Sequence, residues 1–385
     1  MVFDLQEQRE AWGLDPQVHH CNHGSYGAVP LEVRAAQRAI QDYVQRNPVG
    51  FFAREAQAQV AAARAKIAAF LGQEPDQIAL VRNATEAAST TLRGFPFQAG
   101  DEALVLDQEY GAVVYAVQRA VANAGGVLRE VAISMDDDPM RMVARVEAAI
   151  HPRTRLLVVD HITSATARVL PVQQLADLCR ERGIAIAVDA SHAPGQLDLD
   201  LDRLDADFWF GNLHKWVCAP LGSAVYRIAP RWQARMRPLI VSWRDLEDYP
   251  APWDMLGTVD ISAWLAAPAA IDFFSRLGWE RVRAANQARM RYGREQVLAA
   301  LGIAKDCLPP DAIAMGLVPL AGMQGGRDAC AALQKRLAEV HRVETAISTC
   351  AGAYYLRVCG QLYNNAADYQ ALALALRAQL RPGLS

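Results

Sequence analysis

A lysine and an aspartate stand at the ends of two apolar runs in this sequence. Lys215 follows the run ADFWF within the stretch GNLHKW, and Asp189 follows the run IAIAV, 26 residues earlier. Burying a lysine as a cation is costly, so a lysine at the end of a buried strand indicates a use for its amine. These two residues predict a site in which the lysine amine reacts with a ligand and the aspartate carboxylate pairs with a positive charge on that ligand.

Other short polar segments follow other apolar runs. If the runs form parallel strands, their carboxyl ends meet at one edge of a sheet, where ligands bind. Taken singly, each segment has an ordinary explanation as a turn, a helix cap or a solvated residue. Their concentration at one edge favours a functional site. The segments are Asn83-Ala84-Thr85-Glu86, Gln108-Glu109-Tyr110, His161-Ile162-Thr163, Asp189 with His192, and Asn212 with His214 and Lys215.

Pyridoxal phosphate requires parts of this kind. An amine must form the Schiff base, and a carboxylate must keep the ring nitrogen protonated so that the ring accepts electrons. A helix N-terminus supplies amide donors and a favourable dipole for the phosphate. Lys215, Asp189 and the helix predicted to begin near Ala84 could supply these parts. A lysine at the end of a buried strand is then explained by the covalent Schiff base that its amine forms with the cofactor.

Helical and strand patterns alternate from about residue 30 onward. Apolar strands alternating with helices predict an α/β fold with a mainly parallel sheet covered on both faces. A Trp-, Pro- and Asp-rich stretch interrupts the pattern over 228–262, and two long helices are predicted over 262–278 and 280–302. We expect a large cofactor-binding domain over 26–262, a smaller α+β C-terminal domain over 263–385, and an N-terminal segment, 1–25, packing on the small domain.

Composition and charge argue against several classes of protein. The net charge of −3 gives no electrostatic basis for nucleic-acid binding, and no apolar run approaches the roughly 20 residues of a membrane span. The first residues lack the pattern of a signal peptide. The cysteines stand singly without a CxxC pair, which predicts reduced thiols in the cytoplasm and no metal site. They are Cys21, Cys179, Cys218, Cys307, Cys330, Cys350 and Cys359.

Several blocks of the sequence resemble those of class V aminotransferase-like, fold-type I enzymes. The resemblance runs from about residue 20 to 370. Within the family, the sequence is most similar to the branch that contains isopenicillin N epimerase and related carbon–sulfur lyases. The blocks are NHGSYGAVP (22–30), RNATE (82–86), DxEYxA (107–112), DASHAPG (189–195), GNLHKWxCAPxG (211–222), GTxD (257–260) and YLRVxxQxYN (355–364).

The resemblance implies roles for the residues around the cofactor ring. Lys215 would hold pyridoxal phosphate and move the substrate's α-proton, and Asp189 would pair with the pyridine nitrogen. His192 would contact the phenolic oxygen, with a capping role as the alternative, and His161 would lie near the same oxygen. Tyr110 would stack on the ring face opposite the lysine, with core packing as the alternative.

The resemblance also implies residues for the phosphate, the substrate and a second subunit. Ala84 and Thr85 would bind the phosphate, assisted by Asn212 and His214. Gly257 and Thr258 would reach the phosphate in the neighbouring subunit, so we expect a homodimer with shared active sites. The substrate would be a small amino acid. Arg357 would bind its carboxylate, unless this arginine is a solvated residue on an edge strand, and Asn22 and the loop that follows it would line the pocket.

The implied chemistry begins with exchange of the lysine for the substrate amine and removal of the α-proton, giving an external aldimine and a quinonoid. Epimerase or lyase chemistry is expected ahead of transamination, and carbon–carbon bond formation stays open. Cys350 and Cys359 do not stand in a clear catalytic loop before Arg357, which disfavours a desulfurase. A helix-turn-helix regulator finds no room before the first block, and a nicotinamide dehydrogenase would need a GxGxxG turn that is absent.

Overall fold

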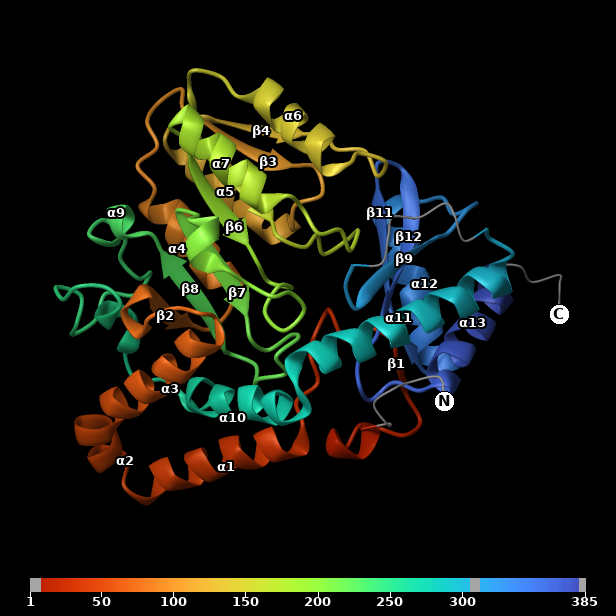
Figure 1. The fold of residues 1–385 in the computed structure, drawn as a ribbon, viewed down its shortest axis with the longest axis horizontal. Coiled ribbons are helices and arrows are strands. Elements are labelled where there is room, and N and C mark those ends of the chain that lie inside the picture. Colours follow the sequence, from red (N-terminus) through yellow and green to blue (C-terminus); the bar gives the residue numbers. More distant parts are fainter. Residues whose placement is uncertain (1–7, 305–311, 381–385) are drawn as a thin grey trace.

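The computed structural model describes residues 8–304 and 312–380 of this 385-residue chain. Cys307 and the first seven residues of the predicted N-terminal segment lie outside these ranges. A seven-stranded sheet flanked by helices makes up the larger part, and a three-stranded sheet with its own helices lies beside it (Figure 1). The strands of the large sheet lie within residues 78–228, and those of the three-stranded sheet lie within residues 315–359.

The seven-stranded sheet is mixed but mainly parallel, since only β8 runs against its neighbours. Its apolar runs are buried on both faces, as parallel sheets require. The alternation of strands and helices does not predict β8, whose short sequence AVYRI follows β7 through a loop. The order across the sheet is β2 (Ile78–Val81), β8 (Ala224–Ile228), β7 (Phe208–Asn212), β6 (Ala185–Asp189), β5 (Thr154–Asp160), β3 (Glu102–Leu106) and β4 (Val127–Val131).

Helices cover both faces of this sheet. Successive strand residues enter opposite cores: Leu157 lies in one apolar cluster and Val158 in the other. Helices α4 (Ala84–Gly94) and α5 (Gly111–Asn123) cover the face of Val158. The opposite face is covered by α1 (Leu31–Arg46), α3 (Ala56–Phe70), α6 (Pro139–Ala149), α7 (Val172–Arg182) and α10 (Ser262–Leu277). Shorter helices are η1 (Arg9–Ala11), α2 (Pro48–Gly50), η2 (Phe51–Glu55), η3 (Pro75–Gln77), α8 (Leu201–Leu204), α9 (Pro230–Gln233) and η4 (Ala251–Asp254).

The smaller sheet is antiparallel, and β12 is its central strand. A separate apolar cluster packs it against the C-terminal helices. The N-terminal strand β1 (His19–His20) pairs in parallel with β10 (Val343–Glu344), so the start of the described chain is attached to this part. The other elements are β9 (Met315–Pro319), β11 (Ala346–Cys350), β12 (Ala353–Cys359), α11 (Trp279–Leu301), α12 (Gly326–His341) and α13 (Ala366–Leu380).

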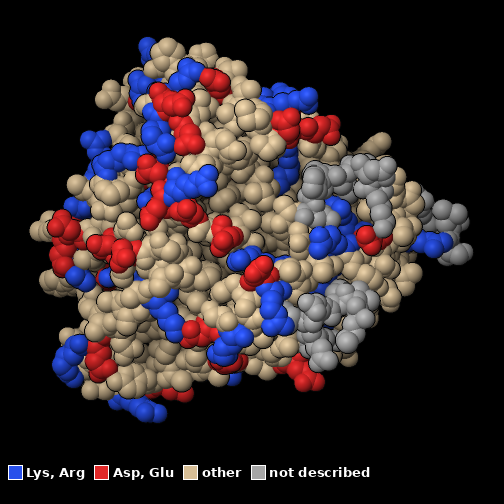
Figure 2. Space-filling model, in the orientation of Figure 1, with Lys and Arg blue, Asp and Glu red and all other residues tan. Residues whose placement is uncertain are grey.

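The surface has no broad region of one charge on the face that Figure 2 shows, where basic and acidic side chains are interspersed. None of the helices within residues 8–304 and 312–380 combines the length and the apolar character needed to cross a bilayer.

Candidate active site

The polar segments after β3, β5, β6 and β7 meet at one edge of the large sheet, because these four strands are parallel. Asp160, the last residue of β5, pairs in register with Asp189, the last residue of β6. On the other side, Asp189 pairs with Phe210 of β7, two residues before Asn212. The strand ends therefore bring Asp189, Asn212 and Lys215 to the same edge, as the sequence predicted.

Lys215 is largely buried within this edge rather than solvated. Its Nζ lies 3.2 Å from Nε2 of His192. Burial lowers the pKa of Lys215 from its ordinary 10.5 to about 8. Arg357 lowers this pKa as well, while Asp189 and Asp160 raise it and offset part of the effect. The amine is thus prepared to act as a nucleophile near neutral pH.

The hydrogen bonds of His192 determine which of its ring nitrogens carries the proton. Trp216 donates its indole N–H to Nδ1 of His192 at 3.3 Å, so Nδ1 is an acceptor and the proton is on Nε2. Burial, followed by the charge of Lys215, keeps the pKa of His192 well below its ordinary value, so the ring is neutral. Its Nε2–H then faces Lys215, an arrangement that suits a neutral amine acceptor and opposes an ammonium group.

Asp189 is only 1% exposed and lies next to two other buried carboxyl groups. Its Oδ1 accepts the backbone N–H of Ser191 at 2.8 Å. Glu109 and Asp160 each place a carboxylate oxygen within 4.8 Å of Asp189 and of each other. Burial is the main cause of the raised pKa of Asp189, which the bonds from Ser191 and the charge of Lys215 oppose.

The N-terminus of α4 lies beside the end of β7. Asn83 caps the helix by accepting the N–H of Glu86 at 2.9 Å, and Asn212 accepts the N–H of Ala84 at 2.9 Å. Thr85, in the first turn of α4, is exposed, and no side-chain hydrogen bond is recorded for it within residues 8–304 and 312–380. His214 has an unpartnered, buried Nδ1, and burial lowers its pKa to about 4. The N–H groups of Ala84 and Glu86 are therefore already bonded within this chain, and an anion at this helix N-terminus would have to displace Asn212 or use Thr85 and His214.

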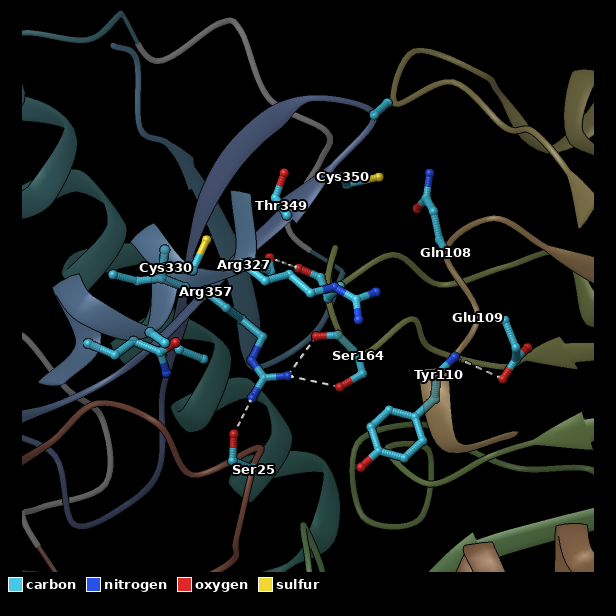
Figure 3. Close-up of a pocket in the computed structure, with 18 of the residues that line it drawn as sticks. Ser25, Gln108, Glu109, Tyr110, Ser164, Arg327, Cys330, Thr349, Cys350 and Arg357 are labelled. Atoms are coloured by element: carbon cyan, nitrogen blue, oxygen red, sulfur yellow. Dashed lines mark hydrogen bonds between the residues drawn. The ribbon is translucent and has the colours of Figure 1, made fainter. Parts of the chain in front are cut away.

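Arg357 lies on the central strand β12 and is 4% exposed, so the alternative of a solvated edge residue is wrong. One terminal nitrogen donates to the backbone oxygen of Ser164 at 2.6 Å. The other donates to Asn22 and to Ser25, both at 2.9 Å. Its Nε is buried without a partner among the described residues. Figure 3 shows this guanidinium beside Ser25 and Ser164.

A cavity of about 480 Å³ separates Arg357 from the end of β3. Tyr110 lines the cavity and is 47% exposed, which argues against the alternative of core packing. Cys350 lines the same cavity, and burial raises the pKa of its thiol. Figure 3 shows the Tyr110 ring and Arg357 on the two sides of this space. The cavity can accept a small amino acid whose carboxylate reaches Arg357.

The backbone of His161 lies next to that of Asp189. Its N–H donates to the backbone oxygen of Asp189 at 2.7 Å, and its Nδ1 is buried without a partner in residues 8–304 and 312–380. Burial lowers the pKa of this imidazole to about 4, so the ring is neutral. His161 therefore offers an unused ring nitrogen in the site.

Cys359, the last residue of β12, is fully buried.

Gly257 and Thr258 do not join this group within one copy of the chain. Thr258 lines another cavity, together with Gln41 and Phe52, at the start of α10. That cavity shares no lining residue with the cavity of Tyr110 and Arg357. The predicted role of these two residues toward a neighbouring subunit stays a prediction.

The N-terminal loop supports the lysine from behind. His23 lies 3.0 Å from the backbone oxygen of Lys215 and 3.0 Å from the hydroxyl of Tyr363. Burial lowers the pKa of His23 to about 4, so it is a neutral bridge between the two. Gly27 packs directly on the backbone oxygens of His214 and Lys215, where a Cβ atom would overlap them.

The loop after Asn22, which the sequence predicts to line the pocket, contributes His23 and Ser25, whereas Ser164 and Asp160 are not predicted as site residues. Ser164 follows β5 directly after the segment His161-Ile162-Thr163. Asp160 is the last residue of β5. A pair of strand-final acids, Asp160 and Asp189, was the signal that could have identified it.

Comparisons with known proteins agree with this geometry. The class-V aminotransferase family matches residues 33–311. Isopenicillin N epimerase of Streptomyces clavuligerus is 32% identical over 396 residues, covering 98% of each chain. A probable chloroplastic L-cysteine desulfhydrase of Arabidopsis thaliana is 29% identical over 402 residues, covering 96% of this chain and 84% of that one. The chain therefore belongs to the class-V aminotransferase family of pyridoxal-phosphate-dependent enzymes.

A solved structure shows the same fold. The cystine C–S lyase C-DES, in a mutant with glycine covalently linked to its PLP cofactor, matches with a TM-score of 0.81 and 21% identity. The match covers 97% of this chain and 99% of that chain. This confirms the predicted fold-type I architecture, with a mainly parallel large sheet and a small antiparallel C-terminal sheet.

The side chains present fit the cofactor of this family. A buried amine with a pKa of about 8 is available for an imine, and a buried carboxylate lies on the neighbouring strand. The unpartnered ring nitrogens of His161 and His214 provide groups for a polar ligand beside the start of α4. These features suit an aldehyde that also carries a phosphate and a basic ring nitrogen.

Proposed function

We propose that this protein holds pyridoxal phosphate on Lys215 and removes the α-proton of an amino acid, with epimerisation as the leading outcome. The observation that carries the proposal is the largely buried Lys215 amine, 3.2 Å from a neutral His192. Epimerisation is preferred because the isopenicillin N epimerase relative aligns with nearly the whole chain. β-Elimination of a sulfur group is the second candidate, favoured by the L-cysteine desulfhydrase relative.

Arg357 is proposed to bind the substrate carboxylate. Its planar fork suits two oxygens, and its unpartnered Nε has no other use among the described residues. Asn22 and Ser25, which now accept from this guanidinium, would exchange their bonds when a carboxylate arrives. The α-carbon of the substrate is then proposed to lie in the cavity between Arg357 and Tyr110, on the side of Lys215.

Protons at the α-carbon are assigned to two side chains. When bound, the cofactor supplies an electron-poor ring that stabilises the negative charge left at the α-carbon. The neutral amine of Lys215 takes the α-proton. Epimerisation needs a second proton donor, and the hydroxyl of Tyr110, on the cavity wall, is proposed for that step. β-Elimination needs no second donor of this kind.

The remaining predicted roles concern binding. Asp189 is proposed to pair with the ring nitrogen, while His192 and His161 hydrogen-bond the phenolic oxygen. The first turn of α4, at Ala84 and Thr85, is proposed for the phosphate, with Asn212 and His214 beside it. These residues are proposed to bind and orient the cofactor, and none of them is proposed to transfer the α-proton.

We also propose a homodimer in which Gly257 and Thr258 complete the partner's phosphate site. The segment before them carries exposed apolar side chains, with Trp243 87% exposed and Leu246 96% exposed. Apolar side chains gathered in this way on a surface are typical of a protein–protein interface. The separate cavity at Thr258 agrees with a role outside its own chain's site.

The cofactor is tested by adding pyridoxal phosphate to the purified protein and recording the visible absorbance of the imine. Borohydride should then fix the cofactor to Lys215, as located by peptide mass spectrometry, and Lys215→Ala should abolish both signals. A protein that never takes up the cofactor, or one labelled at another lysine, would contradict the proposal.

The reaction is tested with single amino acids in heavy water. Deuterium at the α-carbon with loss of optical purity identifies epimerisation, and pyruvate with sulfide identifies β-elimination. A keto acid formed with the aminated cofactor identifies transamination, and a new carbon–carbon bond identifies a condensing enzyme. Tyr110→Phe should suppress epimerisation while deuterium exchange continues. The proposal is overturned if no amino acid exchanges its α-proton in a manner that depends on Lys215.

A further inference from the structure

Three carboxyl groups meet at the edge of the large sheet, and no arginine of residues 8–304 and 312–380 forms an ion pair with them. Asp160 and Asp189 end neighbouring strands in register, and Glu109 reaches them from the turn between β3 and α5. One oxygen of each lies within 4.8 Å of the others, and the exposed fractions of Glu109, Asp160 and Asp189 are 8%, 3% and 1%. Among the described residues, Lys215 is the cation that acts on Asp160 and Asp189.

Three charges so close together in a dry site repel each other, and some of these groups must therefore keep a proton. Asp189 is the best placed to carry the charge, since it accepts the N–H of Ser191 and lies near Lys215. Glu109 uses one oxygen to accept the N–H of Tyr110 at 3.1 Å. The other oxygen of Glu109 and Oδ2 of Asp160 are buried and have no partner in the described part of the chain.

We propose that Glu109 and Asp160 form a pair of neutral carboxylic acids behind Asp189, which leaves Asp189 as the single anion of the cluster. Both are positioning residues, and the inference rests on the proposed function, in which that anion faces the cofactor nitrogen. Burial raises the pKa of both groups well above the ordinary range, and the neighbouring carboxylates raise it further.

The neutral state of Glu109 and Asp160 affects the protonation of Lys215 as well as the charge of Asp189. Asp189 acts on Lys215 from the neighbouring strand and Arg357 acts from β12, whereas Asp160 would raise the pKa of Lys215 only if it were ionised. The buried rings of His161, His192 and His214 are neutral. Ionised Glu109 and Asp160 would stabilise an ammonium at position 215. Two neutral acids let the site carry one negative charge, which matches one protonated ring nitrogen and leaves the lysine free of its proton.

The first test uses infrared spectra of the cofactor-free protein at neutral pH with a chelator present. A protonated carboxyl has a carbonyl stretch that a carboxylate lacks. We expect this band in the wild type and expect each of Glu109→Gln and Asp160→Asn to remove part of it. A wild-type spectrum with no such band, or one that neither variant changes, overturns the proposal. If a variant does not fold, the persistence of the wild-type band at neutral pH decides.

The second test measures the pKa of Lys215 in the cofactor-free protein by competitive acetylation and mass spectrometry. Replacing a neutral acid by its amide leaves the charge unchanged, so Glu109→Gln and Asp160→Asn should change this pKa little. Asp189→Asn is the matched control, and it should lower the pKa because a real charge is lost. Amide variants at 109 and 160 that lower the pKa as much as Asp189→Asn would show that both acids are ionised, and would overturn the proposal.

The competing outcome is a cation held by ionised acids, since carboxylate oxygens are ligands for Mg²⁺ and Ca²⁺. Loss of the infrared band on adding either ion at millimolar concentration, with measurable binding, would support that outcome against ours. The tests also separate the two proposals. A band present in a protein that never binds pyridoxal phosphate overturns only the proposed function, whereas a cofactor-binding protein without the band overturns only the acid pair.

Discussion

The state of Lys215 before the cofactor arrives gives the sharpest prediction. Burial lowers its pKa from 10.5 to about 8. At pH 7.5 about a quarter of the amine is then neutral, against about 0.1% for an ordinary lysine, so the reactive fraction rises about 250-fold. Because the neutral form is the nucleophile, the rate of imine formation should increase with pH, pass its midpoint near 8 and become constant above it.

The measurement is stopped-flow absorbance of cofactor-free protein mixed with excess pyridoxal phosphate across this pH range. Nα-acetyl-lysine under the same conditions is the reference, which removes the pH dependence of the aldehyde itself. Asp189→Asn should move the midpoint to lower pH, because Asp189 raises the pKa of Lys215. The reasoning is refuted if the rate continues to rise through pH 10 without a plateau, as it does for the reference amine.

Three further predictions follow from the cavity and the surface. Arg357→Lys keeps a cation but loses the planar fork, so KM for an amino-acid substrate should rise roughly 10- to 100-fold in steady-state assays; an unchanged KM would place the carboxylate elsewhere. Leu246→Glu puts a charge on an exposed apolar side chain and should shift sedimentation from dimer toward monomer, with Leu374→Glu, also exposed and on α13, as the matched control that should not. Cys350 has a thiol pKa raised by burial, so Cys350→Ser should keep activity within about threefold, and a loss of 100-fold or more would reveal a thiolate mechanism.

Much of the fold was predictable because its parallel strands, apart from the edge strand β4, are buried on both faces. Runs such as LLVV and IAIAV are apolar throughout, which separates them from half-exposed strands. The family resemblance and the fold class predicted from the sequence are confirmed by the comparisons. The antiparallel β8 was missed, because a short strand after a loop carries no sign of its direction.

The site was predictable in its sequence-local parts and less so in its long-range parts. Lys215, Asp189 and His192 follow strands that the sequence marks clearly. The burial of Arg357 depends on β12 being the central strand of its sheet, and strand order is a property of pairing between distant segments. The meeting of Glu109 with Asp160 depends in the same way on β3 lying beside β5. The roles of these residues toward cofactor and substrate stay predictions.

The contact between Gly27 and the backbone of Lys215 has a consequence for protein engineering. Shortening the N-terminal arm, meaning the segment before α1 that contains Gly27, or giving Gly27 a side chain, would displace the turn that carries Lys215. The seven strands of the large sheet should stay paired. Such a variant should fold with normal circular dichroism yet form its cofactor adduct slowly. Tags and fusions are therefore best joined ahead of this arm, and libraries aimed at new substrates should hold position 27 fixed.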